Sequence, residues 1–298
     1  MYFLNKIENV SKLFREAVVR VPFFFSILFL CVLSGPTKLA SAPSEYVQLR
    51  AQNGDLVLGE FYPTTSLGKA PTIFMLHGCG GLWRDDGTLG SRFKLWRDLF
   101  LEQGYHVFLL DSFTGRNAAS QCKVKNHERV ARANVERPQD VLLGLGWLKN
   151  DQRVDPQKIV LGGWSNGAMT MLWTMANKQS EPGAFFKAAF GFYPGCKKIL
   201  REKPHYKPSI ETLLLLAKED NWTYAAPCER LVRDSNKNGV ARMSVVTFPG
   251  AYHGFDNPDM PLREITVAGG RKVFLGSNEQ ARIRAQQHIL QFLSVVLE

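Results

Sequence analysis

One serine, one histidine and one carboxylate occur at positions where they could form a nucleophilic site. Ser165 lies in GWSNGAM (163–169), flanked by glycines and directly after the apolar run KIVLG. A serine hydroxyl is a poor nucleophile at neutral pH and needs a neighbouring base. A strand, a sharp turn and a helix around GxSxG would present the hydroxyl, because glycines leave room on so tight a turn. We therefore predict that Ser165 is a nucleophile; the alternative is an ordinary serine at a strand-to-helix turn.

The base that such a serine needs is best supplied by His253, one of six histidines. His253 stands in PGAYHGFD, after the last apolar strand that the pattern indicates and before the closing helix. His106 opens an apolar strand and His288 lies within the closing helix, so both are expected to be structural. His253 would take the serine proton as general base, unless it is an ordinary loop residue.

The carboxylate should lie between these two residues, just past a core strand. Asp220 meets this condition in LLLLAKEDNW, with Glu219 and then Asp256 as rivals. Its carboxylate would accept the imidazole N–H, fix the tautomer and stabilise the imidazolium. Alternatively, Asp220 caps the helix expected over YAAPCERLV.

Two backbone N–H groups are expected to stabilise the oxyanion that forms when the serine attacks a carbonyl. The first is that of Asn166, helped by the N-terminus of its helix. The second comes from the glycine-rich loop HGCGGLW (77–83), where we favour the N–H of Cys79 over that of Gly80. Cys79 as the nucleophile itself is the alternative, although it lies on a loop and not at a strand-to-helix turn.

These residues need a scaffold, and the chain supplies alternating apolar strands and amphipathic helices. Near-continuous apolar strands separated by helices indicate a parallel sheet covered on both faces. No linker interrupts the series, so we expect one domain over residues 43–298. Strands are expected at 56–62, 72–78, 105–113, 158–164, 188–194, 212–218 and 244–250, and helices over 92–104, 138–150, 166–178 and 278–297.

Two stretches depart from this alternation. Residues 114–134 are polar and basic and contain Cys122. Residues 257–276 include ITVAGGRKVFL, which predicts a hairpin turning at Gly269 and Gly270. Insertions of this kind either shape a binding cleft or decorate the surface.

Residues 1–42 form a separate segment. Basic residues precede an apolar core at about Phe23 to Leu33, and the small residues Ala40-Ser41-Ala42 follow. This core is nearer the ~7–15 residues of a signal peptide than the ~20 of a membrane span. We expect a secretory signal, which would make the protein periplasmic or secreted; the alternative is a retained N-terminal anchor that tethers it to the membrane.

Composition narrows the range of partners. The formal net charge is +10, of which residues 43–298 hold about +7. This surplus either attracts anionic substrates or an anionic membrane face, or it is a solvated surface with no partner. No nucleic-acid motif is present, so no nucleic-acid partner is expected. Beyond Cys31, four cysteines permit two disulfides in three pairings. Without a CxxC pair or a histidine cluster, no metal site is expected.

With these motifs in order, the chain resembles the dienelactone hydrolase family of α/β-hydrolases over about residues 45–297. The resemblance rests on LHGCGG (76–81), LLDSF (109–113), GWSNGAM (163–169), FYPGC (192–196), KEDNWTYAAPC (218–228) and PGAYHGFD (249–256). It implies an α/β-hydrolase fold with a mostly parallel eight-stranded sheet, and hydrolysis of esters or lactones through an acyl-enzyme without a cofactor. The family's nucleophile, acid and base fall on Ser165, Asp220 and His253.

One departure from the family is the nucleophile, because the enzymes that name it use cysteine where this chain has serine. The serine points to a serine-type branch of esterases and away from dienelactone itself as substrate. Within the resemblance, Cys196 with Cys228 is the first choice for a disulfide, since both follow core strands beside the Asp220 loop. Cys79 with Cys122 is then the second.

The predicted function is hydrolysis of a small-molecule ester or lactone on a Ser-His-Asp triad. Trp164, Trp222 and Tyr252 are candidate substrate contacts, with core packing as the alternative for each. Other functions on the same fold are a catalytically silent binding protein and a transacylase or amidase. Substrate identity and oligomeric state are not determined by the sequence.

Overall fold

The computed structural model describes residues 43–298 except 67, 178–185 and 238–241, so the predicted signal or anchor in residues 1–42 lies outside the described residues. The described residues form one compact unit. Its strands are β1 Glu45–Arg50, β2 Leu56–Tyr62, β3 Ala70–Leu76, β4 His106–Asp111, β5 Val154–Trp164, β6 Ala188–Phe192, β7 Glu211–Ala217, β8 Met243–Phe248, β9 Arg263–Thr266 and β10 Lys272–Leu275. Its α-helices are α1 Ser91–Glu102, α2 Glu136–Asn150, α3 Asn166–Asn177, α4 Lys197–Glu202, α5 Ala225–Asn236 and α6 Glu279–Val296.

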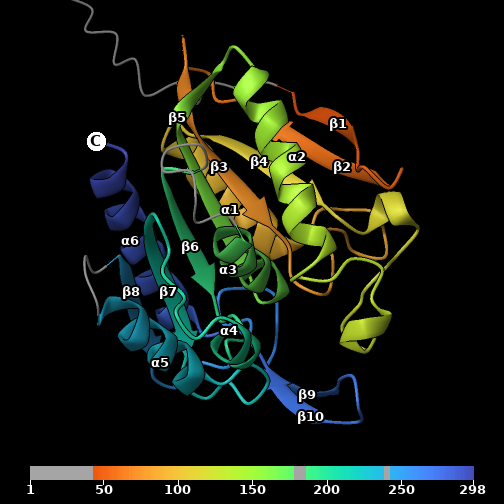
Figure 1. Ribbon diagram of the computed structural model, residues 1–298, viewed down its shortest axis with the longest axis vertical. Helices are drawn as coiled ribbons and strands as arrows, with labels where there is room; N and C mark the ends of the chain where they lie inside the picture. Colours follow the sequence, from red (N-terminus) through yellow and green to blue (C-terminus); the bar gives the residue numbers. More distant parts are fainter. Residues whose placement is uncertain (1–42, 67, 178–185, 238–241) are drawn as a thin grey trace, which may run out of the picture. The chain divides into compact units, whose positions relative to one another are not determined.

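Eight of these strands form one sheet in the order β1-β2-β4-β3-β5-β6-β7-β8. β2 runs antiparallel to both of its neighbours, and every neighbouring pair from β4 to β8 is parallel. The predicted mostly parallel eight-stranded sheet is therefore confirmed. The carboxyl ends of the parallel strands meet at one edge, near which α4 and the β9–β10 hairpin lie in the lower part of Figure 1.

Helices cover both faces of the sheet, because the strands are apolar on both sides. In β7, Leu214 and Leu216 pack into one core, together with side chains of α2, α3 and α5. Leu213 and Leu215 pack into the other core, with side chains of α1 and α6. Successive side chains of a strand point to opposite faces, so one apolar run serves two cores.

The predicted strands and helices all occur, and their ends differ from the predictions by a few residues. The structure adds two elements that the pattern did not indicate, the edge strand β1 and the six-residue helix α4. The predicted hairpin is β9–β10, in which Thr266 pairs with Lys272 and both turn glycines have positive φ. No helix in the described part of the chain is long and apolar enough to span a membrane.

Candidate active site

Ser165 occupies a strained turn between two regular elements. It follows β5 directly, precedes α3, and has a φ of 51°, which non-glycine residues rarely adopt. Its N–H donates a hydrogen bond of 2.9 Å to the Phe192 carbonyl at the end of β6. The serine is thereby held at the carboxyl edge of the sheet, where the residue is 8% exposed.

The two glycines of GxSxG are required by close backbone contacts. A Cβ on Gly163 would lie 2.6 Å from the Gly167 carbonyl carbon. A Cβ on Gly167 would lie 2.3 Å from the Leu76 carbonyl oxygen and 2.7 Å from that of His77. Helix α3 therefore presses directly on the end of β3, which brings Ser165 next to the loop that follows β3.

His253 reaches Ser165 from the loop after β8. Its Nε2 lies 3.0 Å from the Ser165 Oγ, and its ring lies 4.5 Å from that of Tyr193 and 4.7 Å from that of Trp222, measured between ring centroids. The His253 carbonyl accepts a 3.1 Å hydrogen bond from the N–H of Gly276, just after β10. The hairpin thus supports the loop that carries the imidazole.

Asp220 completes a hydrogen-bonded row behind the imidazole. Its Oδ2 lies 2.7 Å from the His253 Nδ1, and its Oδ1 accepts bonds of 2.8 Å from the N–H groups of Trp222 and Thr223. Burial raises the pKa of Asp220, but the imidazole and the Thr223 bonds outweigh burial, so the pKa lies below its usual value. Because Nδ1–H donates to a charged carboxylate, Nε2 is left to accept the serine proton.

Asp256, a rival for the acid, is engaged elsewhere. This fully buried carboxylate accepts hydrogen bonds from the indole N–H groups of Trp96 and Trp164 at 2.9 and 2.7 Å. It also accepts from the Tyr193 hydroxyl and, at 3.2 Å, from Arg92. These bonds anchor the loop three residues after His253. Asp256 therefore stabilises that loop and is not the acid that contacts the imidazole.

Two further predictions about this region need correction. Trp164 is fully buried under the site, with its ring stacked 5.3 Å from that of Phe192, so it cannot contact a substrate. Tyr252 lies with its ring centroid 6.0 Å from that of Phe274 in the hairpin and does not line the cleft at Ser165.

Trp222, the third candidate substrate contact, does line that cleft. Glu219, the other rival acid, is exposed and makes no described contact with His253.

The predicted oxyanion donors, Asn166 and Cys79, line the same cleft as Ser165. Among the described residues, neither backbone N–H donates a hydrogen bond to another protein group. The N–H groups at the start of α3 have no helical partner, which makes them available to an anion. Both donors are therefore placed where a substrate oxygen could meet them.

The cleft at Ser165 has a volume of about 460 Å³ and a strongly basic lining. Arg129, Lys198, Arg201 and Arg271 line it, and no carboxylate of the described residues does. Within the described residues, only Arg201 of these four forms an ion pair with a carboxylate, that of its neighbour Glu202. Three of the four side chains thus place positive charge near Ser165 without a carboxylate partner in the described chain.

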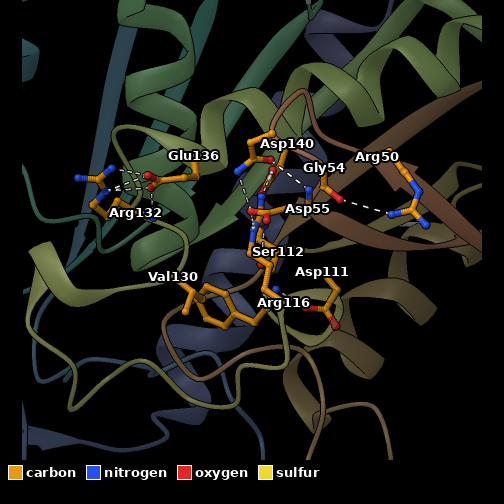
Figure 2. Close-up of polar contacts among 12 residues, drawn as sticks. Arg50, Gly54, Asp55, Asp111, Ser112, Arg116, Val130, Arg132, Glu136 and Asp140 are labelled. Atoms are coloured by element: carbon orange, nitrogen blue, oxygen red, sulfur yellow. Dashed lines mark hydrogen bonds and ion pairs between the residues drawn. The ribbon is translucent and has the colours of Figure 1, made fainter.

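The polar insertion 114–134, which carries Arg129, is anchored at both ends (Figure 2). At its start, Arg116 makes two 2.8 Å bonds to the buried carboxylate of Asp140 and one of 2.7 Å to Asp55. At its end, Arg132 pairs with Glu136 in the first turn of α2. The insertion is therefore part of the cleft wall and not a loose surface decoration.

Both predicted disulfides are present. Cys79–Cys122 joins the loop after β3 to the insertion, with a Cα–Cα distance of 4.9 Å. Cys196–Cys228 joins the start of α4 to α5, with a Cα–Cα distance of 5.1 Å. Disulfides are typical of proteins outside the cytoplasm, so they agree with the predicted export. No group of three or more metal-ligating side chains lies together in the described ranges.

Sequence reasoning did not single out Thr223 or the basic lining. The Thr223 hydroxyl lies 2.9 Å from the Asp220 Oδ2 and from the Tyr193 carbonyl, which bridges the acid to β6. The charges at Arg129 and Arg271 lie in the two stretches that departed from the alternation, so counting charge there would have found them. Lys198 gave no such signal, because α4 was not expected.

Comparisons with known proteins agree with this architecture. Residues 60–297 match the model of the dienelactone hydrolase family. A Klebsiella pneumoniae protein named as a dienelactone hydrolase is 14% identical over 85% of this chain and 99% of its own, with a TM-score of 0.64. Thermogutta terrifontis esterase 2, in a structure phosphorylated by paraoxon, is 17% identical over 85% and 94%, with a TM-score of 0.60. A dienelactone hydrolase-like promiscuous phosphotriesterase from metagenomic libraries is 15% identical over 86% and 99%, with a TM-score of 0.59. A search of curated proteins found no match.

Proposed function

The chain belongs to the dienelactone hydrolase family, and we propose that it hydrolyses carboxylic esters or lactones through an acyl-enzyme formed on Ser165. The observation that carries the proposal is the continuous row from the Ser165 Oγ to the His253 Nε2 at 3.0 Å and from Nδ1 to Asp220 at 2.7 Å. Membership of a family of ester hydrolases and the left-handed turn at Ser165 support the same chemistry.

In the first half-reaction, the Ser165 oxygen attacks the substrate carbonyl while its proton passes to the His253 Nε2. The negative charge on the former carbonyl oxygen is held by the N–H groups of Asn166 and Cys79. The imidazolium then gives its proton to the leaving alcohol oxygen, and the C–O bond breaks. In the second half-reaction, His253 removes a proton from water, the hydroxide attacks the acyl carbon, and Ser165 leaves with its proton restored.

The basic lining of the cleft narrows the proposed substrate class. Arg129, Lys198 and Arg271 approach the site from three separate segments without a carboxylate partner in the described chain. Such a concentration of positive charge raises the local concentration of anions and favours substrates that carry one. The proposed substrate is therefore an ester or lactone with an acidic group near the scissile carbonyl.

The decisive test is active-site labelling with a fluorophosphonate probe followed by mass spectrometry. The wild type should carry one label on Ser165, and Ser165→Ala should fold, remain unlabelled and lose esterase activity. Ser120→Ala, which removes an exposed serine of the insertion, should label like the wild type. Equal labelling of Ser165→Ala and the wild type would refute the proposal.

Labelling together with two activity measurements separates the alternatives. A silent binding protein would take no label and would not turn over p-nitrophenyl acetate. A transacylase would direct the acyl group to an added alcohol in preference to water, which product analysis would reveal.

A further inference from the structure

The first turn of α2 contains a buried arginine that the proposed mechanism does not use. Arg137 is fully buried, yet its guanidinium forms no hydrogen bond with a carboxylate of the described chain. Burial lowers the pKa of Arg137 to about 10, against the opposing effect of the nearby Asp140 and Asp111, so the group stays charged at neutral pH. The Asp140 carboxylate is occupied by Arg116 instead.

The guanidinium donates to two neutral oxygens on different segments. One nitrogen lies 2.6 Å from the Asn166 Oδ1, and another lies 2.9 Å from the His77 carbonyl oxygen. Asn166 begins α3, and His77 begins the loop that contains Cys79. Arg137 therefore links the two segments that carry the proposed oxyanion donors, one bond to each.

The loop between Arg137 and the cleft has its peptide groups oriented by the same cluster. The His77 Nδ1 lies 2.7 Å from the Gly78 carbonyl oxygen, and its Nε2 accepts a 3.2 Å bond from the Ser112 N–H. This pairing requires a neutral ring with its proton on Nδ1, and burial together with the Arg137 charge holds the pKa of His77 well below its usual value. The carbonyls of His77 and Gly78 thus both accept hydrogen bonds from the buried cluster.

The hydrogen bond to the Gly78 carbonyl fixes the direction of the N–H group in the same peptide, that of Cys79. In a trans peptide the C=O and N–H groups point in opposite directions. With the Gly78 oxygen bonded to the buried His77 ring, the N–H of Cys79 is directed away from that ring, and Cys79 lines the cleft. If the loop lost its anchor at His77, this peptide could rotate and withdraw the donor.

We infer that Arg137 is a positioning residue for the oxyanion hole: it joins the His77 loop to the start of α3 and so holds the N–H groups of Cys79 and Asn166 toward one substrate oxygen. The inference rests on the proposed function. Its physical basis is that preorganised donors stabilise the transition state only if they are already oriented before charge develops.

A purely structural role accounts poorly for a charged side chain at this position. A buried guanidinium that forms no hydrogen bond with a carboxylate bears a desolvation cost. Two buried nitrogens here also have no hydrogen-bond partner in the described chain, the Nε of Arg137 itself and the Nδ2 of Asn166. Replacing buried ionic groups by apolar side chains of similar size is often neutral or stabilising. Stability and activity should therefore respond differently to the loss of this arginine.

The test compares Arg137→Met with Leu145→Ala, a core truncation on the same helix that faces the sheet. Arg137→Met should lower kcat for a neutral ester about 10- to 100-fold, somewhat less than the loss of a whole oxyanion donor. KM and the pH midpoint of kcat/KM should stay close to wild-type values, because Ser165, His253 and the cleft are intact. Phenylboronic acid, which forms a tetrahedral adduct on the serine, should bind more weakly by a similar factor.

Leu145→Ala should lower the melting temperature and leave kcat within about twofold of the wild type. The inference is overturned if Arg137→Met keeps the wild-type kcat and boronate affinity, or if Leu145→Ala loses activity to the same extent. Should Arg137→Met fail to fold, Arg137→Lys retains the charge but its single ammonium cannot replace the planar fork. A folded lysine variant should lose about 3- to 10-fold in kcat, and wild-type activity there would also overturn the inference. Failure of the triad itself would show separately, as activity that survives in Ser165→Ala.

Discussion

Two parts of the cleft differ in how their polar groups are held. The inner edge consists of Ser165, Asp220 and His253 on the loops after β5, β7 and β8. The outer wall consists of the insertion 114–134, α4 and the β9–β10 hairpin. Side chains of the inner edge are buried and hydrogen-bonded to one another. The outer wall instead presents basic side chains to the cleft, and of these Arg129, Lys198 and Arg271 have no carboxylate partner in the described ranges.

This difference indicates that the two parts of the cleft have different functions, proton transfer in the inner edge and electrostatic attraction in the outer wall. A buried, fully bonded row keeps one geometry, as proton transfer over hydrogen-bond distances requires. Unpaired charges near solvent act over a longer range and depend on ionic strength. We therefore expect changes in the inner edge to lower turnover of every substrate, and changes in the cleft-lining basic residues of the outer wall to alter the preference among substrates.

The largest effect is expected from removing the base. His253→Ala should lower kcat for p-nitrophenyl acetate by about 10⁶-fold, because it removes the imidazole that would accept the Ser165 proton. His127→Ala, at an exposed histidine of the outer wall, should keep wild-type activity. Steady-state kinetics would measure both, and substantial turnover by His253→Ala would contradict the assignment of chemistry to the inner edge.

Removing the acid should lower kcat less than removing the base does. Asp220→Asn should lower kcat by about 10⁴-fold, because the amide no longer holds the imidazole in the productive tautomer. Glu219→Gln, one residue earlier and exposed, should have no effect. Equal loss of activity in the two variants would contradict the assignment of Asp220 as the acid that holds the imidazole.

Asp220 should also make stability depend on pH. The pKa of Asp220 in the folded protein lies below its ordinary value near 3.8. The carboxylate therefore contributes fully to the free energy of unfolding above that ordinary value, and this contribution is lost as the pH falls through the pKa of the folded state. The difference in free energy of unfolding between wild type and Asp220→Asn should therefore shrink from about pH 6 to about pH 3. Urea titrations at several pH values would measure it, and a constant difference would contradict the lowered pKa.

A backbone change at the inner edge should affect both stability and rate. Gly167→Ala would place a Cβ 2.3 Å from the Leu76 carbonyl oxygen, so α3 and Ser165 must shift. We expect a loss of about 2–4 kcal/mol in stability and about 10- to 100-fold in kcat. Gly146→Ala in α2, where the added Cβ would meet no atom within 4 Å outside the helix's own backbone, should instead be stabilising by up to about 1 kcal/mol.

The smallest effect is expected in the outer wall, and only for charged substrates. Lys198→Glu should lower kcat/KM about 10-fold for a p-nitrophenyl ester of a dicarboxylic acid, and less than about threefold for the acetate. The difference between substrates should diminish in about 0.5 M salt. Lys123→Glu makes the same charge change on an exposed side chain outside the cleft lining and should leave the preference unaltered. Equal losses for both esters would show that the outer wall does not select for charge.

Much of the fold followed from local patterns in the chain. β7 is an example: its continuous leucines predicted a strand buried on both faces, and Leu213 to Leu216 alternate between the two cores. β1 was missed because an edge strand buries only part of one face, and α4 because six residues are too few for a helical period. The contacts that stabilise these elements come from other parts of the chain: β1 pairs along its length with β2, and α4 packs against α5.

The sequence by itself determined the order of strands and helices and the turn that bends at Ser165, because hydrophobic periodicity and glycine placement are local properties of the chain. It also placed a histidine and a carboxylate just past core strands. Only the tertiary structure decided which carboxylate faces the imidazole, that Trp164 is buried against Asp256, and that basic residues from three segments share one cleft. Those outcomes depend on distances between side chains far apart in the chain, and only the packing of the sheet and its loops sets such distances.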